Sequence, residues 1–270
     1  MDADEEIAAY YNRGEEAARL SGPARLELVR TQELIARHLP DPPAAILDVG
    51  GGPGAYALWL AERGYVVHLL DPIELHIDEA RAAAEAEGVV LAGAVVGDAR
   101  DLPHADDSVD AVLLLGPLYH LQEREDRLRA LREAHRVLRR GGLLAAAAIS
   151  RFASTVDGLA RGHFADPRFE AIVERGLRDG RHLNPERHES WFTTAFFHLP
   201  AELADEVREA GFELAGVLAV EGPGEVVPDI DAWLDDPVKR ATLLRAIGRV
   251  EAEPTMIGSS PHLLALATAG

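Results

Sequence analysis

The sequence predicts an α/β fold: a doubly wound, mostly parallel sheet of seven strands with helices on both faces. Short apolar runs alternate with segments of helical periodicity through the first half, and glycine follows most of the helical segments. The runs are apolar on both faces, which is typical of parallel strands covered by helices. The predicted strands are residues 45–49, 66–70, 89–96, 109–115, 143–149, 212–220 and 262–268.

Helical segments connect these strands, with one interruption. Residues 151–199 break the alternation and hold short helical pieces, scattered histidines and an aromatic cluster, so we expect them to cap the ligand edge of the sheet. We predict helices at residues 26–38, 55–63, 75–87, 123–140, 200–210 and 230–252. One domain, 1–270, is expected, with an N-terminal helical lid (1–43), a ligand-binding core (44–150), the inserted helical cap (151–199) and the last part of the sheet (200–270).

The composition excludes several classes of function. The formal charge is −19, from 27 basic and 46 acidic residues, and this field repels nucleic acid. The chain has no cysteine, so disulfides, thiolate metal sites and cysteine nucleophiles are excluded. The cap histidines match no metal-binding spacing, and no metal is predicted there. These histidines are His163, His182, His188 and His198.

The N-terminus and the hydropathy indicate where the protein works. Its first residues are acidic, whereas a signal peptide begins basic and then becomes apolar. No apolar stretch approaches the roughly 18–20 residues of a membrane span. We therefore expect a cytoplasmic protein with no membrane partner.

The most informative segment follows the first strand, where four glycines occur within five residues before a helix begins. Such a turn lets the backbone approach a nucleotide-like ligand. Gly50-x-Gly52-x-x-Ala55 also satisfies the dinucleotide fingerprint. Asp71 ends the second strand 21 positions after Gly50, where its carboxylate can accept both ribose hydroxyls of an adenosine ligand. These features alone leave NAD and S-adenosylmethionine open.

Further motifs narrow the choice. Asp48 stands two residues before the first glycine, Gly-Asp-Ala follows the third strand at 97–99, and Val-Asp-Ala-Val begins the fourth at 109–112. Arg-Gly-Gly-Leu-Leu then follows a helix at 140–144. With these motifs the chain resembles the class I S-adenosylmethionine-dependent methyltransferases, closely over 45–150 and loosely over the last 70 residues. The resemblance implies a Rossmann-like fold and S-adenosylmethionine as cofactor, with S-adenosylhomocysteine as product.

The resemblance also implies roles for the cofactor-binding residues. The backbone of Gly50, Gly51 and Gly52 would lie under the methionine and ribose, and Asp71 would hold the ribose. Asp48 would reach the methionine ammonium directly or through water; the alternative is a carboxylate that bonds the local turn. The remaining assignments are Pro72 and Ile73 on the adenine face, Asp98 and the Ala99 N–H on the adenine edge, and Leu115 beside the cofactor. Asp98 alternatively caps a turn.

The residues that act on the methyl acceptor are expected in the segment after the fourth strand. His120 is a candidate general base, or a histidine satisfied by backbone. Tyr119 would face the sulfonium, or would belong to the core.

In the N-terminal segment, Tyr11 would form part of a lid and Arg30 would meet the methionine carboxylate, whereas Arg19 is expected on a solvated helix face. The cap aromatics Trp191, Phe192 and Phe196 would line an apolar acceptor pocket or form the cap's own core.

These observations favour methyl transfer to a small molecule, at O or N. The alternatives are a protein or RNA methyltransferase, a non-catalytic S-adenosylmethionine-binding protein, and an NAD(P)-dependent oxidoreductase. The oxidoreductase has little support, because the chain has no Tyr-x-x-x-Lys pair and its only lysine is Lys239.

Overall fold

A computed structural model describes residues 3–14, 16–19, 22, 24–188 and 190–270, so the predicted lid at 1–43 lies partly outside the described residues. The expected doubly wound α/β fold is confirmed. Within the described residues the sheet has nine strands, in the order β3-β2-β1-β4-β5-β7-β6, with β9 pairing β5 and β8. The parallel part comprises β1 to β5, and β9 runs antiparallel to both of its neighbours.

The strands are β1 (Ala45–Val49), β2 (Val66–Asp71), β3 (Gly93–Val96), β4 (Val109–Leu114), β5 (Leu138–Ser150), β6 (Arg181–His182), β7 (Ala195–His198), β8 (Phe212–Ala219) and β9 (His262–Ala269). The helices are α1 (Ala3–Tyr11), α2 (Glu16–Arg19), α3 (Arg25–Ala36), α4 (Ala55–Ala61), α5 (Glu74–Glu87), α6 (Pro117–His120), α7 (Arg124–Val137), α8 (Ala153–Arg161), α9 (Pro167–Asp179), α10 (Pro200–Glu209), α11 (Ile230–Asp235), α12 (Pro237–Gly248) and α13 (Pro254–Ile257). Two 3₁₀ turns, η1 (His163–Ala165) and η2 (Gly222–Val226), complete the described elements.

The prediction of seven strands was wrong by two. The additional strands, β6 and β7, lie in the inserted segment and pair with each other. β7 also runs parallel to the end of β5, with Ile149 opposite Phe197 and Ser150 opposite His198. All four residues of β7 are buried. The insertion is therefore part of the sheet as well as a helical cap.

Two predicted helices end earlier than expected. The helix predicted at 123–140 ends at Val137, because β5 begins at Leu138 and includes the glycine pair that looked like a helix stop. The helix predicted at 230–252 is divided into α11 and α12. Asp236 is extended there, as a residue before proline prefers, and its side chain caps α12 by accepting from the Val238 N–H.

The core has one layer on each face of the sheet. Helices α7 and α10 cover one face, and α3, α4 and α5 cover the other. Neighbouring residues of β1 show the division, because Leu47 packs into the first layer and Ile46 into the second. This double burial explains why the parallel strands are continuously apolar.

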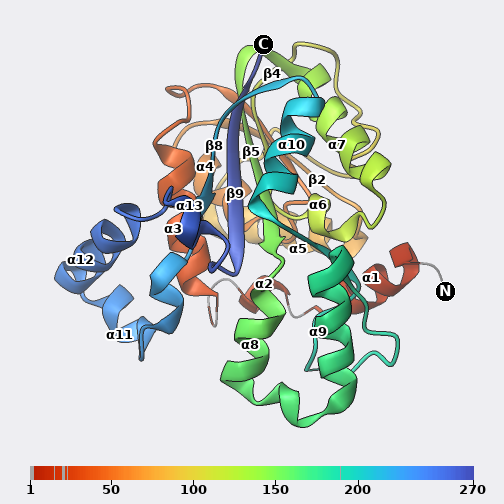
Figure 1. Ribbon diagram of the computed structural model, residues 1–270. Coiled ribbons are helices and arrows are strands. Elements are labelled where there is room, and N and C mark those ends of the chain that lie inside the picture. The colour runs from red at the N-terminus through yellow and green to blue at the C-terminus, as the bar shows by residue number, and fades with distance from the viewer. Residues whose placement is uncertain (1–2, 15, 20–21, 23, 189) are drawn as a thin grey trace.

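The carboxyl ends of the parallel strands meet at one edge of the sheet. Figure 1 shows α1, α2, α6, α8 and α9 gathered around the end at which β5 finishes. The loops after β1, β2 and β4 therefore come together there, which is the usual position of a ligand crevice in such sheets. Among the described residues, no helix is both long and apolar enough to cross a membrane.

Candidate active site

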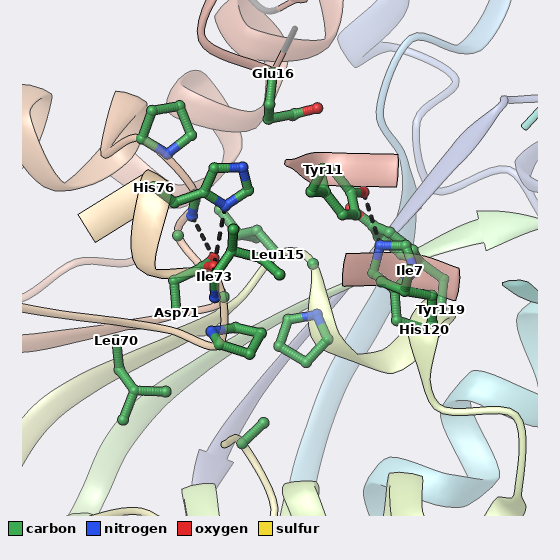
Figure 2. A pocket seen from close by; sticks show the side chains of 18 of the residues that line it. Ile7, Tyr11, Glu16, Leu70, Asp71, Ile73, His76, Leu115, Tyr119 and His120 are labelled. Atoms are coloured by element: carbon green, nitrogen blue, oxygen red, sulfur yellow. Dashed lines mark hydrogen bonds and ion pairs between the residues drawn. The ribbon is translucent and has the colours of Figure 1, made fainter. Parts of the chain in front are cut away.

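A cavity of about 370 Å³ lies at this edge of the sheet. The loops after β1, β2, β3 and β4 form its floor, and residues of α1 and α2 contribute to its lining. Figure 2 shows two polar groups facing each other across it: Asp71 and His76 on one side, and Tyr11, Tyr119 and His120 on the other.

The glycine turn after β1 lies so close to neighbouring side chains that any side chain at Gly50 or Gly51 would collide with them. Gly50 has a φ of 67°, and a Cβ added there would lie 2.7 Å from the Pro117 ring. A Cβ on Gly51 would lie 2.5 Å from Oδ2 of Asp48. Both glycines and Gly52 line the cavity, so bare backbone forms this part of its wall.

Asp71 is held by hydrogen bonds on both of its carboxylate oxygens. Its Oδ2 accepts from the Gly52 N–H at 2.9 Å, and its Oδ1 accepts from the Ile73 N–H at 2.9 Å. The imidazole Nδ1 of His76 lies 3.0 Å from Oδ1. Both side chains are almost fully buried. Asp71 therefore ties the glycine turn to the start of α5.

The predicted adenine-binding residues also reach the cavity. Pro72, Ile73, Asp98, Ala99 and Leu115 are all in its lining. The Asp98 carboxylate accepts from the backbone N–H and the guanidinium of Arg100. Burial would raise the pKa of Asp98, but the Arg100 bonds outweigh it and lower the pKa. Asp98 is therefore ionised and already partly engaged.

Helix α1 lines the cavity and is fastened at two neighbouring points. The Tyr11 hydroxyl lies 2.8 Å from Nε2 of His120, and the Thr194 hydroxyl donates to Glu6 at 2.9 Å. Burial lowers the pKa of His120 to about 4 and raises the pKa of both Tyr11 and Tyr119. The His120 ring is therefore neutral at neutral pH, and its pKa does not match that of a strong general base.

A partly buried charged cluster completes the lining. Arg19 donates to Glu16 at 2.8 Å and to Glu27 at 2.6 Å, and all three residues line the cavity. Behind them, Nδ1 of His262 lies 2.5 Å from Glu221 and 3.8 Å from Glu27. Burial would lower the pKa of His262, but the two carboxylates outweigh it and raise the pKa to about 9.

This cluster also contains a geometry that could hold a metal ion, because ligand atoms of Glu27, Glu221 and His262 lie within 4.8 Å of one another. The sequence predicted no metal. A metal ion would have to displace the proton that His262, with a pKa of about 9, holds at neutral pH, and the Arg19 guanidinium adds a second positive charge beside Glu27. The cluster is described better as a network of ion pairs.

Two predicted cofactor residues lie away from the cavity lining. Arg30 is completely buried and donates to the Val220 carbonyl, Glu33 and Glu251. The expected contact of Arg30 with a ligand carboxylate is therefore corrected: its partners are structural, and Arg19 occupies the cavity instead. Asp48 is buried under the glycine turn, without a hydrogen-bond partner for either oxygen among the described residues. Burial and the charge of Asp71 raise the pKa of Asp48 to about 7.

The cap aromatics divide between two environments. Trp191 packs with Phe169 and Val173 in the cap's own core, and Phe196 lies under the Arg127 guanidinium at 3.6 Å. Phe192 lies beside the cavity, with its ring stacked on His120 at 6.1 Å between centroids. None of the three lines the cavity, so the placement of Trp191 and Phe196 in an acceptor pocket is corrected, and Phe192 reaches the site only through its contact with His120.

Sequence reasoning missed His76, Glu16, Glu27 and Pro117. His76 had a usable signal, because it stands in the first turn of the helix that follows Asp71. Glu16 had none, because α2 has four residues and no periodicity to orient it. Glu27 lies in the first turn of α3, and its ion pair with Arg19 depends on how α2 packs beside that helix.

The glycine turn and the acid from the next strand have the arrangement expected of a protein that binds an adenosine-type ligand. Residues 47–146 match the sequence model of a family described as "Methyltransferase domain". An uncharacterised methyltransferase of Mycobacterium tuberculosis is 39% identical over 112 residues, 42% of each chain. A malonyl-[acyl-carrier protein] O-methyltransferase of Methylococcus capsulatus is 37% identical over 140 residues, 49% of this chain and 48% of the relative.

A third relative, tRNA 5-carboxymethoxyuridine methyltransferase of Escherichia coli, is 28% identical over 177 residues, 65% of this chain and 62% of its own. The crystal structure of an S-adenosylmethionine-dependent methyltransferase from Methanosarcina mazei shares the fold, with a TM-score of 0.59, 19% identity, and coverage of 87% of this chain and 96% of that one. The match spans less than half the length of the first two relatives.

Together these matches support the resemblance: residues 47–146 match a methyltransferase domain, and the chain shares its fold with an S-adenosylmethionine-dependent methyltransferase. A methyltransferase domain implies S-adenosylmethionine as the cofactor, with S-adenosylhomocysteine as its product. The bare glycine turn and the acid that ends β2 fit that cofactor. The nicotinamide alternative is therefore set aside.

Proposed function

We propose that the protein transfers a methyl group from S-adenosylmethionine to an oxygen or nitrogen of a small molecule. One observation carries the proposal: α1 lines the cavity and is held to its wall by the Tyr11–His120 and Glu6–Thr194 contacts. A cavity of about 370 Å³ bounded by such a helix suits an enclosed acceptor rather than a polymer.

The cofactor half would use the loops after β1, β2 and β3. The glycine turn lies under the methionine and ribose, Asp71 holds the ribose, and Pro72 and Ile73 cover the adenine, with Asp98 and the Ala99 N–H at its edge. Leu115 borders the ribose side at the end of β4. The bound cofactor supplies an electrophilic methyl group on a positively charged sulfur.

Arg19 and Glu27 are proposed to receive the methionyl end. A guanidinium and a carboxylate 2.6 Å apart, both facing the cavity, match the carboxylate and the ammonium of an amino acid. Burial would raise the pKa of Glu27, but His262 and Arg19 outweigh it and lower the pKa, so this carboxylate is charged.

The acceptor half would lie around Tyr11, Tyr119 and His120. In its neutral form His120 accepts a hydrogen bond, so it can orient the lone pair of an acceptor hydroxyl or amine toward the methyl group. With a pKa of about 4, His120 is a weak base and does not take the acceptor's proton before the methyl transfer. Its proposed role is to orient the acceptor. Tyr119 and Phe192 close the apolar side, with their ring centroids 6.4 Å apart.

Nucleic acid is the less favoured acceptor, although one relative is a tRNA methyltransferase. The net charge of −19 opposes binding of a polyanion.

Labelled S-adenosylmethionine incubated with a fractionated metabolite extract, bulk tRNA and bulk protein tests the proposal. We expect label in a small-molecule fraction. Label confined to tRNA or protein would contradict the proposed acceptor class, and cofactor binding without label in any fraction would indicate a non-catalytic protein.

A further inference from the structure

The acid that ends β2 has fewer free acceptor positions than the sequence led us to expect. Oδ1 of Asp71 accepts from the Ile73 N–H and faces Nδ1 of His76, and Oδ2 accepts from the Gly52 N–H. A carboxylate offers about four acceptor positions in all. The protein therefore fills three of them, and one position on Oδ2 is left.

The position of His76 is well defined. Its ring packs edge-on against Tyr11, with centroids 5.4 Å apart, and a Cβ added to Gly52 would lie 4.0 Å from Nδ1. Since the carboxylate partner can only accept, Nδ1 is the protonated nitrogen and donates. The ring is thus held between the lid helix, the glycine turn and Asp71.

The opposite nitrogen of His76 indicates that packing alone does not explain this residue. Nε2 is buried and has no hydrogen-bond partner among the described residues. An imidazole buried with one nitrogen unsatisfied lowers stability relative to an apolar side chain of similar size. The polar contact that the ring does make in the described part of the chain is the one to Asp71.

We propose that Asp71 recognises the cofactor's ribose through a single hydroxyl, at Oδ2, and that His76 is the positioning residue that imposes this readout. By filling Oδ1, the His76 N–H denies the second hydroxyl an acceptor on this carboxylate and fixes the carboxylate plane. The inference rests on the proposed ribose-binding role of Asp71. It predicts that the affinity for the cofactor falls when one ribose hydroxyl is removed and changes little when the other is removed.

Calorimetry with S-adenosylhomocysteine and its 2′-deoxy and 3′-deoxy analogues tests this. The native protein should lose at least tenfold in affinity with one analogue and less than threefold with the other. His76→Leu frees a position on Oδ1, so the two losses should become similar. His76→Asn, which keeps an N–H close to the place of Nδ1, should preserve the native difference.

Equal tenfold losses with both analogues in the native protein would overturn the single-hydroxyl readout. An unchanged difference in His76→Leu would overturn the role of His76. If His76→Leu does not fold, the native protein and His76→Asn still decide the first point. Native affinity that is insensitive to both deoxy substitutions would instead remove Asp71 from the ribose site, a result distinct from either failure.

Discussion

The hydroxyl of Tyr11 lies 2.8 Å from Nε2 of His120, although the two residues are 109 positions apart in the sequence. Tyr11 belongs to α1, and His120 belongs to α6, the short helix after β4. Their contact lies on the proposed acceptor side of the cavity, and at neutral pH it joins a neutral imidazole to a protonated phenol. The effects that we expect on turnover and on its pH dependence follow from this pair of residues.

Removing His120 should affect turnover more than cofactor binding. We expect His120→Ala to lower turnover at least tenfold and to change the Kd of S-adenosylhomocysteine less than threefold, because His120 faces the proposed acceptor. Tyr11→Phe keeps the ring and removes one hydrogen bond, worth about 0.5–1.5 kcal/mol, so its effect should be smaller. Turnover that is unchanged in His120→Ala would exclude the proposed orienting role.

The pH dependence of turnover provides a separate check on His120. Because burial lowers its pKa to about 4, the ring keeps its acceptor nitrogen above pH 5. The turnover profile should therefore have no inflection near pH 6.5, the ordinary value for histidine. An inflection near 6.5 that disappears in His120→Gln would mean that the ring titrates normally and acts as a base.

Replacement of Asp71 should weaken cofactor binding directly. Hydrogen bonds to charged groups are worth about 1.5–3 kcal/mol, so Asp71→Asn should raise the Kd of S-adenosylmethionine at least tenfold. Asp78→Asn is the matched control, since Asp78 lies exposed on α5 beside Arg81. Calorimetry on both variants checks the prediction, and equal affinities would exclude Asp71 from the site.

Arg19 and Arg30 should give opposite phenotypes. Arg19→Met should lower the affinity for S-adenosylmethionine but leave the affinity for 5′-methylthioadenosine unchanged, because that nucleoside lacks the amino acid group of the cofactor. Arg30→Met should instead destabilise the fold by about 3–5 kcal/mol, since it leaves buried partners unpaired. Calorimetry and urea unfolding of both variants separate the two roles, and the reverse pattern would restore Arg30 as the ligand residue.

Asp48 should make stability depend on pH. Its pKa is about 7 in the folded protein, against an ordinary aspartate value of 3.8, so the folded state binds more protons than the unfolded state between these values. The free energy of unfolding should therefore fall as pH rises from 4 to 7. Asp48→Asn removes this contribution, so its stability relative to the native protein should increase over that range by at most about 4 kcal/mol. Urea unfolding of both proteins at pH 4.5 and 8 measures this difference in stability. If the difference is the same at both pH values, Asp48 lies in a hydrated environment.

The parts of the site that could be predicted are those set by the backbone. Gly50 and Asp71 follow buried parallel strands, and the carboxyl ends of such strands meet at one edge, so the sequence order alone places them together. Arg30 was misplaced despite a readable signal. It is spaced four residues from Leu26 and Leu34, all three of which are buried on one stripe of α3.

The rest depends on packing between distant segments. Arg19 and Glu27 enter the cavity because α2 and the start of α3 fold against the glycine turn, and α2 carries no pattern that would predict this. The strands of the insertion were missed for a related reason. Two of the four residues of β7 pair with the end of β5 and the other two with β6, and local periodicity does not predict either pairing.

The pairing of β7 with β5 has a consequence for redesign. The insertion is hydrogen-bonded into the sheet at Ile149–Phe197, so it is not an exchangeable loop. Grafting a relative's segment in place of residues 151–199 would remove a strand from the end of β5 and expose buried backbone. Altering acceptor preference in this protein therefore calls for point changes around Phe192, with the scaffold of the insertion left intact.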